Sequence, residues 1–198
     1  MKRMFVALFF VLLIVNQSFA LAGLRIGANA NLVQPAATLA LDLPVEDPEF
    51  NPTGFGVTGC AVADIVFFKI TADVGYIDFG EQTLDFNIPA ISSFAMPEAS
   101  AKITVIPIMV GLRKEFGLPV GPKFHIGAQV GVHNFTYTFG GDAVDLGILE
   151  AEETESKFSF SPIVGVRISS LDASLLYMVI EDFNYIGLRV GYTFGFGI

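Results

Sequence analysis

The 198-residue sequence contains no tryptophan and a single cysteine, Cys60. One thiol excludes an intramolecular disulfide, so the fold must be stabilised in another way. Basic residues are also scarce: 11 Lys and Arg stand against 20 Asp and Glu, which gives a formal net charge of −9 at pH 7. Because the phosphates of nucleic acid repel a chain this acidic, nucleic acid is excluded as a partner.

The chain also lacks an apolar run as long as the roughly 20 residues that a membrane-spanning helix needs. Nevertheless, 53% of its residues are hydrophobic and its mean hydropathy is +0.61. A soluble protein of this composition would expose large contiguous apolar patches, which normally mark a contact with membrane or with a partner. We therefore expect contact with lipid through something other than a helix.

The N-terminus has the layout of a secretory signal peptide. Two basic residues precede an apolar run over residues 4–15, which is too short for an uncleaved anchor helix. Small residues follow, and cleavage is expected after Ala20 or Ala22. We predict a signal peptide over residues 1–22 and one exported domain over residues 23–198. Loss of the two positive charges takes the formal net charge from −9 to −11.

Apolar residues alternate with polar or small residues over several segments, as in strands whose two faces meet different surroundings. In residues 186–196, every even position is large and apolar, whereas the odd positions hold Gly, Arg or Thr. Residues 24–32 show a similar pattern. Six weaker segments lie between them, at about 54–63, 66–79, 101–116, 123–139, 157–168 and 172–181. The sequence thus predicts eight strands.

The connections between these strands alternate in length. Short links are expected at residues 63–65, 117–122 and 169–171, long links at about 34–53, 80–100 and 140–156, and a tight last link at 181–185. Transmembrane barrels have short periplasmic turns and longer outer loops. We therefore predict an all-β fold, an eight-stranded antiparallel up-and-down transmembrane β-barrel. A secreted soluble β-sandwich, or a small lipid-binding barrel with an apolar interior, is the alternative fold.

Two prolines, Pro107 and Pro162, fall inside predicted strands. Each removes a hydrogen bond from the ladder between strands, which is the main objection to the predicted sheet. We interpret both positions as β-bulges.

The last strand carries the most specific motif. Residues 189–196 (RVGYTFGF) have the order polar-x-Gly-x-x-aromatic-x-aromatic, with Gly197 and Ile198 after it. This resembles the β-signal by which the outer-membrane assembly machinery recognises its barrel clients. Residues 106–116 (IPIMVGLRKEF) are similar to the fourth strand of small barrels of this kind. The resemblance is to the small eight-stranded bacterial outer-membrane β-barrel family (the outer membrane protein beta-barrel domain). It implies a Gram-negative outer-membrane location but no particular reaction.

An eight-stranded barrel is just wide enough for side chains to fill its interior. Because buried charges must be paired, we expect an ion-paired plug there, with a ligand or proton pathway as the alternative. Passage of solutes by simple diffusion would need a wider barrel. By their parity along the strands, eleven residues are predicted to face inward: Arg25, Lys69, Asp73, Arg113, Glu115, His125, Gln129, His133, Arg167, Asp172 and Arg189.

His125 and His133, the only histidines, lie eight residues apart on one predicted strand. At about 3.3 Å per residue they are roughly 26 Å apart, too far to share a metal ion. We therefore predict no metal site and no cofactor. The chain resembles eight-stranded lipid A deacylases in architecture, but those use a closely spaced Ser/His pair. Here Gly127 and Phe135 stand two residues after the histidines. We assign no catalytic residue, and a lipid-modifying outer-membrane enzyme is the alternative function.

Phenylalanine is abundant, with 20 residues. Rings near strand ends are expected to form the aromatic girdles that transmembrane barrels place at both membrane interfaces. A role in filling a core is the alternative. Seven residues are predicted for the girdles: Phe55, Phe79, Phe116, Phe124, Phe139, Phe158 and Phe196.

Most acidic residues fall in the predicted connections, with almost no Lys or Arg among them. We expect a solvated, self-repelling surface there. The alternative is that divalent cations or a basic partner bridge residues 142–155. The predicted function is thus non-enzymatic, either structural or a surface interaction through acidic outer loops. Fifteen of the 20 acidic residues belong to this set: Asp42, Glu46, Asp47, Glu49, Glu81, Asp85, Glu98, Asp142, Asp145, Glu150, Glu152, Glu153, Glu155, Glu181 and Asp182.

Overall fold

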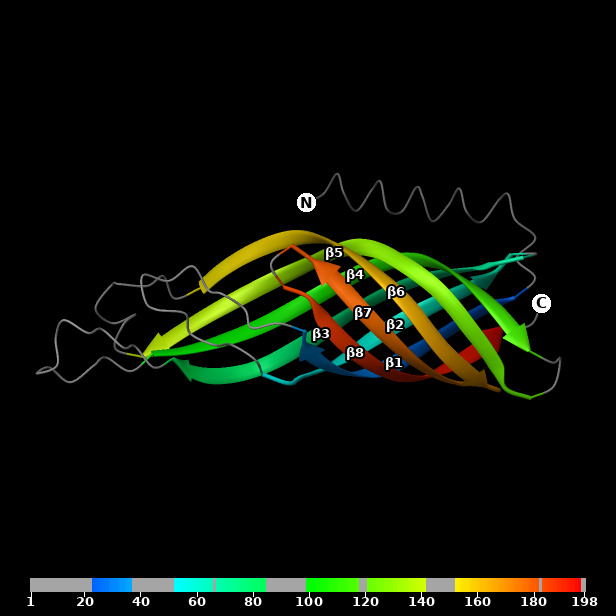
Figure 1. Ribbon diagram of the computed structural model, residues 1–198, viewed down its shortest axis with the longest axis horizontal. Coiled ribbons are helices and arrows are strands. Elements are labelled where there is room, and N and C mark those ends of the chain that lie inside the picture. Colours follow the sequence, from blue (N-terminus) through cyan, green and yellow to red (C-terminus); the bar gives the residue numbers. More distant parts are fainter. Residues whose placement is uncertain are drawn as a thin grey trace, which may run out of the picture.

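A computed structural model describes residues 23–36, 52–65, 67–84, 99–117, 121–141, 152–181 and 183–196. They form eight strands: β1 (Leu24–Pro35), β2 (Gly54–Asp64), β3 (Lys69–Leu84), β4 (Ala99–Gly117), β5 (Lys123–Gly141), β6 (Glu152–Ile168), β7 (Leu171–Ile180) and β8 (Tyr185–Phe196). Each strand pairs antiparallel with the next, and β8 pairs with β1 to close the barrel (Figure 1). The predicted eight-stranded barrel is confirmed. Its closed ring excludes the β-sandwich.

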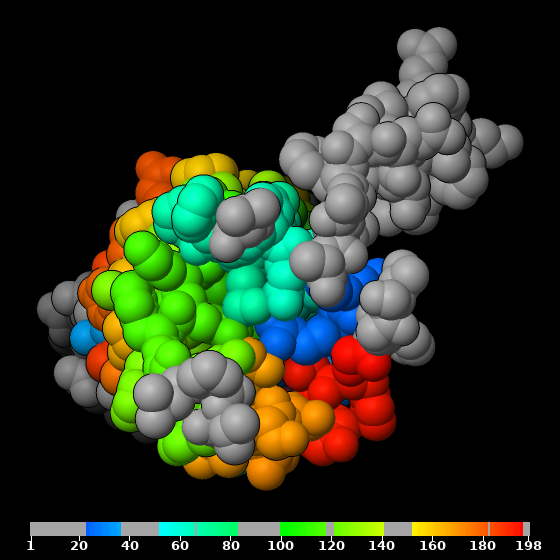
Figure 2. All heavy atoms as spheres, turned by 90° about the vertical axis from the view of Figure 1, so that its right-hand side faces the viewer, coloured from blue at the N-terminus to red at the C-terminus, as the bar shows by residue number. Residues whose placement is uncertain are grey.

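No helix among the described residues is long and apolar enough to cross a membrane. The predicted signal peptide, residues 1–22, lies outside the described residues and stays a prediction. Both ends of the described chain meet at one end of the barrel, where Leu24 of β1 pairs with Phe196 of β8. Figure 2 views the molecule from this end, with β1 in blue next to β8 in red. We call this the terminal end and the opposite one the far end.

The strand bounds differ from the prediction in two ways. The third strand begins at Lys69 rather than at residue 66, because Ile65 and Phe68 exchange backbone hydrogen bonds of 2.8 and 3.2 Å that close a turn. This turn is apolar, so its sequence looked like more strand. In addition, β3 to β6 reach further toward the far end than predicted and extend beyond the other four strands (Figure 1).

The two strand prolines are not β-bulges. The register between β4 and β3 is the same before and after Pro107, and the register between β6 and β7 is the same before and after Pro162. In each case only the proline and one adjacent residue are left without a partner on that neighbouring strand. The β3–β4 register instead shifts between Asp78 and Glu81. Gly80 lies within that shift with a φ of +78°, a left-handed conformation that glycine adopts at little steric cost.

Candidate functional site

The barrel is apolar on the outside. Large hydrophobic residues on the outward faces of all eight strands are exposed, and we call this set the apolar belt. Ile108 on β4 is 49% exposed, Val164 on β6 49% and Leu188 on β8 48%. Because contiguous apolar surface of this extent needs a non-aqueous partner, the belt is the surface of a lipid-embedded barrel.

The belt ends before the strands do. On β4 the belt residues are Ile106, Ile108, Val110, Leu112 and Phe116, and the next outward residue toward the far end is Thr104. On β5, Asn134 follows Val132 in the same direction, and on β6, Ser156 follows Phe158. The far parts of β4, β5 and β6 thus stand beyond the lipid.

The interior of the terminal half is polar, as predicted. All eleven residues predicted to face inward do so, and each exposes 15% or less. The pleat of a strand sends alternate side chains to opposite faces, so parity was enough to find them.

The carboxylate of Glu115 is the centre of an ion-pair network in the interior at the terminal end. Four cations surround Glu115: Arg167 at 2.5 Å, Arg113 at 3.2 Å, and Arg25 and Lys69 at 3.5 Å each. Lys69 and Arg25 also pair with Asp64, at 2.6 and 3.2 Å. These groups come from five different strands. Their attraction therefore holds the ring of strands together from within.

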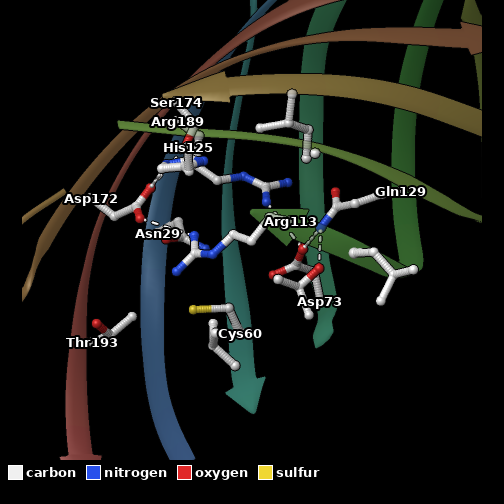
Figure 3. Close-up of a pocket in the computed structure, with 15 residues that line it drawn as sticks. Asn29, Cys60, Asp73, Arg113, His125, Gln129, Asp172, Ser174, Arg189 and Thr193 are labelled. Carbon is white, nitrogen blue, oxygen red and sulfur yellow. Dashed lines mark hydrogen bonds and ion pairs between the residues drawn. The ribbon is translucent and has the colours of Figure 1, made fainter. Parts of the chain in front are cut away.

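A second group lies further along the interior (Figure 3). Asp172 accepts hydrogen bonds from Arg113 at 3.0 Å and from the hydroxyl of Ser174 at 2.7 Å, and its Oδ1 lies 3.3 Å from His125 Nε2. Arg113 contacts Oδ2, and Ser174 and His125 share Oδ1, so both oxygens of the buried carboxylate have partners.

Asp73 is the third buried carboxylate. Arg189 donates to it at 3.1 Å, and the side-chain amide of Gln129 donates to the same oxygen. A cavity of about 40 Å³ lies between this group and the Asp172 group. Since a buried water needs about 10–15 Å³ of such space, the cavity has room for about three or four waters.

His133 contacts groups that the sequence analysis did not connect with it. Its Nε2 lies 3.0 Å from the Tyr185 hydroxyl, and its Nδ1 lies 2.9 Å from Ser159 Oγ. Ser159 donates its hydrogen to Met109 Sδ at 3.2 Å, so it accepts from Nδ1–H, and Nε2 accepts from Tyr185. Parity within its predicted strand gives the inward position of Ser159, whereas residue 185 is predicted to lie in the last link, where parity gives no direction.

This Ser/His pair does not have the setting of a catalytic site. His133 and Ser159 both have a relative exposure of 0%, inside the barrel rather than on its lipid-facing surface. The second partner of the histidine is a phenol rather than a carboxylate. Among the described residues, no group of three or more His, Cys, Asp or Glu could hold a metal ion.

Beyond His133, the interior is apolar, which corrects the expectation of a polar plug throughout. Phe183, in the link between β7 and β8, packs edge-on against Phe79 at 5.2 Å and against Phe135 at 5.7 Å between ring centroids. We call the buried cluster to which they belong the apolar cap: Val33, Ile77, Phe79, Ala101, Ile103, Val105, Met109, Phe135, Leu176, Met178, Ile180, Phe183 and Tyr185. The cap closes the barrel toward the far end.

The cap also corrects part of the girdle prediction. Phe79 is buried in the cap, and Phe139 packs against it, so neither faces lipid. The girdle prediction used only the nearness of these residues to strand ends. By their parity along the strand, both side chains face the interior. Phe196 lies in β8, and its side chain is outside the described part. The other four predicted residues are exposed: Phe55 at 66%, Phe116 at 49%, Phe124 at 64% and Phe158 at 69%.

The acidic residues at the far end lie on strands more than predicted. Glu152, Glu153 and Glu155 belong to β6, and Glu81 belongs to β3. Glu181 lies in the link after β7. The ten other residues of the predicted acidic set are outside the described part of the chain: Asp42, Glu46, Asp47, Glu49, Asp85, Glu98, Asp142, Asp145, Glu150 and Asp182.

No family model and no curated protein matches this sequence. Among solved structures, the fold is similar to Neisserial surface protein A, with a TM-score of 0.59 and 13% identity over 86% of this chain and 95% of that one. The fold is that of a small outer-membrane β-barrel. Ail, the attachment invasion locus protein of Yersinia pestis, in complex with the heparin analogue sucrose octasulfate, gives a TM-score of 0.49 at 13% identity over 87% of this chain and 99% of that one. The N-terminal barrel domain of Pseudomonas aeruginosa OprF gives 0.41 at 13% identity, over 86% and 97%.

The fold and the apolar belt together identify the chain as a bacterial outer-membrane barrel. In such barrels both termini and the short turns face the periplasm. The terminal end, with its charged interior, is therefore the periplasmic end. The far end, with the apolar cap and the acidic strand ends, is the outer end.

Proposed function

We propose that this barrel is non-enzymatic and contacts a basic partner at the cell surface through its acidic outer end. The supporting observation is the charge on strand ends that stand beyond the lipid. Glu152, Glu153 and Glu155 occupy three of the first four positions of β6 and are exposed. Lys157 pairs with Glu155 at 3.2 Å, which leaves the other two glutamates without a described cation.

The closed interior supports a surface role rather than a transport role. The cavity next to the apolar cap is only about 10 Å³, too small for a row of waters. A solute would have to displace the cap residues to pass. The outer end is therefore the part of the barrel that we assign to the contact with a partner at the cell surface.

Binding to the folded barrel in lipid nanodiscs tests the proposed contact. The probe is a Lys-rich extended peptide, compared with its neutral Gln counterpart. We expect salt-sensitive binding of the basic peptide, and several-fold weaker binding by a variant with Glu152→Gln, Glu153→Gln and Glu155→Gln. Equal binding by wild type and variant would overturn the proposal.

Calcium titration by calorimetry distinguishes a basic partner from divalent cations as the ligand of the acidic outer end. Heat at millimolar calcium that the triple Gln variant lacks would assign the acidic end to divalent cations instead of a basic partner. No heat would exclude cation bridging. The lipid A of cells that overexpress the protein provides the test for the enzyme alternative, because a mass shift would contradict a non-enzymatic role.

We further propose that the outer-membrane assembly machinery recognises the motif in β8. In support, β8 is the strand that closes the barrel against β1, and Tyr192 and Phe194 of its motif face outward, 44% and 62% exposed. In cells, Phe194→Ala should lower the fraction of chain that resists SDS until it is boiled. Leu188→Ala, on the same face but outside the motif, is the control. Equal folded fractions would contradict recognition through the motif.

A further inference from the structure

One groove interrupts the apolar belt on the wall made by β3, β4 and β5. It has a volume of about 380 Å³ and is almost wholly apolar. Ala128 and the backbone of Gly111 lie between larger side chains, and the lining is Ile70, Val110, Gly111, Leu112, Ala128 and Val130. Leu112 pairs with Ala128 on one side and with Ile70 on the other, so the groove spans all three strands.

A cation stands at the periplasmic end of this groove. Lys114 follows Leu112 on the same outward face of β4, about 7 Å further along the strand. Among the described strand residues, it is the one charged side chain on the outward face of the barrel at this end. Its Nζ lies 5.5 Å from the ring centroid of Phe116 and 5.9 Å from that of Phe68. No described carboxylate pairs with it.

The surroundings place Lys114 at the membrane interface. Phe67 and Phe68, in the turn between β2 and β3, are 77% and 49% exposed, and Phe116 is 49% exposed. Exposed rings beside a lysine at the edge of an apolar belt are typical of the headgroup level. An unpaired ammonium there attracts the phosphate of an anionic lipid.

We propose that this groove and Lys114 form a binding site for one anionic phospholipid of the periplasmic leaflet. The ammonium of Lys114 pairs with the lipid phosphate, and an acyl chain lies in the groove against Ala128 and Gly111. Charge complementarity favours this occupant over a second copy of the barrel, because two copies would bring two Lys114 side chains together. The site is independent of the proposed contact at the outer end.

The lack of tryptophan makes a direct test possible, since one introduced indole reports only its own surroundings. Phe116→Trp places the reporter beside Lys114. Phe194→Trp places it on β8, also lipid-facing at the periplasmic end. The barrel is refolded in vesicles that contain brominated phosphatidylglycerol or brominated phosphatidylcholine, whose bromines quench nearby tryptophan. The SDS heat shift verifies folding of every variant.

From the quenching at Phe116→Trp, we expect brominated phosphatidylglycerol to bind about fivefold more strongly than brominated phosphatidylcholine. At Phe194→Trp, the two lipids should quench the fluorescence equally. Lys114→Gln should abolish the preference. Ala128→Leu, which fills the groove, should reduce it, whereas Ala28→Leu on the lipid face of β1 should not.

Three results would overturn the site. Equal quenching by both lipids at Phe116→Trp would exclude a preference for anionic lipid. A preference that survives Ala128→Leu would show attraction to Lys114 without use of the groove. Absence of quenching by either lipid at Phe116→Trp would show that protein, such as a second copy, covers this wall.

Discussion

The hydroxyl of Tyr185 lies 3.0 Å from Nε2 of His133, at the level where the barrel interior changes from polar to apolar. On the periplasmic side of this contact lie the paired charges around Glu115, Asp172 and Asp73. On the outer side lies the apolar cap, to which Tyr185 itself belongs. The tyrosine therefore joins the two zones, with its ring among apolar groups and its hydroxyl bound to the histidine.

The first prediction concerns this contact. Tyr185→Phe leaves Nε2 of His133 without its donor in a fully buried position. We expect a loss of about 1–3 kcal/mol in the free energy of unfolding, the usual cost of an unsatisfied buried group. Urea unfolding of the barrel in lipid vesicles measures it. Tyr177→Phe on the lipid-facing side of β7 is the control and should have little effect. Equal stability of the two variants would contradict the predicted role of the contact.

Glu115→Gln should destabilise the barrel more than any other single carboxylate-to-amide change at the described positions. It leaves four cations around a neutral group, and breaking a buried ion pair costs about 3–5 kcal/mol. The same unfolding measurement applies. Glu153→Gln, exposed at the outer end, should leave the unfolding midpoint unchanged. A small effect of Glu115→Gln would mean that water rather than the carboxylate balances these cations.

The lone thiol reports on the closure of the interior. Cys60 is 8% exposed and lines the central cavity. A water-soluble maleimide should label it slowly in the folded protein and quickly after unfolding. Removing two rings of the apolar cap, by Phe135→Ala with Phe183→Ala, should speed labelling of the folded barrel. If the rate stays that of wild type although the variant folds, the cap is not what seals the interior.

The outer boundary of the apolar belt can be located by comparing the stability of variants that carry an arginine at different positions along β4. Ile108→Arg puts a guanidinium in the middle of the lipid-facing surface of β4, at a cost of about 2–4 kcal/mol. Thr104→Arg, four residues away on the same face but beyond the belt, should cost about 0–1 kcal/mol. Unfolding in lipid vesicles compares them. Similar costs would place Thr104 in the hydrocarbon layer.

The sequence was sufficient to predict the features that depend on the alternation of side chains along a strand. Because the two faces of each strand meet different surroundings, alternation revealed the strands and the inward charges such as Arg113 and Asp172. The strand ends beyond the lipid were missed, because water covers more of their surface. Glu152 and Glu153 therefore looked like loop residues.

The apolar cap escaped prediction for a different reason. Parity tells which side a residue faces but not which inward residues meet across the barrel. Phe79 and Phe183 are 104 positions apart in the chain, and only the closing of the ring brings their rings together. The proximity of His133 to Tyr185 depends on the same closure.

The outer parts of β5 and β6 pair with each other, but β6 from Glu152 to Phe158 has no partner on β7. The rest of the wall must satisfy lipid on one side and a packed interior on the other. In β6 from Glu152 to Ser156 the outward side chains meet water instead of lipid, whereas Phe135 and Phe139 of β5 still pack in or against the apolar cap. Charge on this stretch can therefore be changed without disturbing the lipid-facing wall, so binding at the outer end and assembly of the barrel can be altered separately.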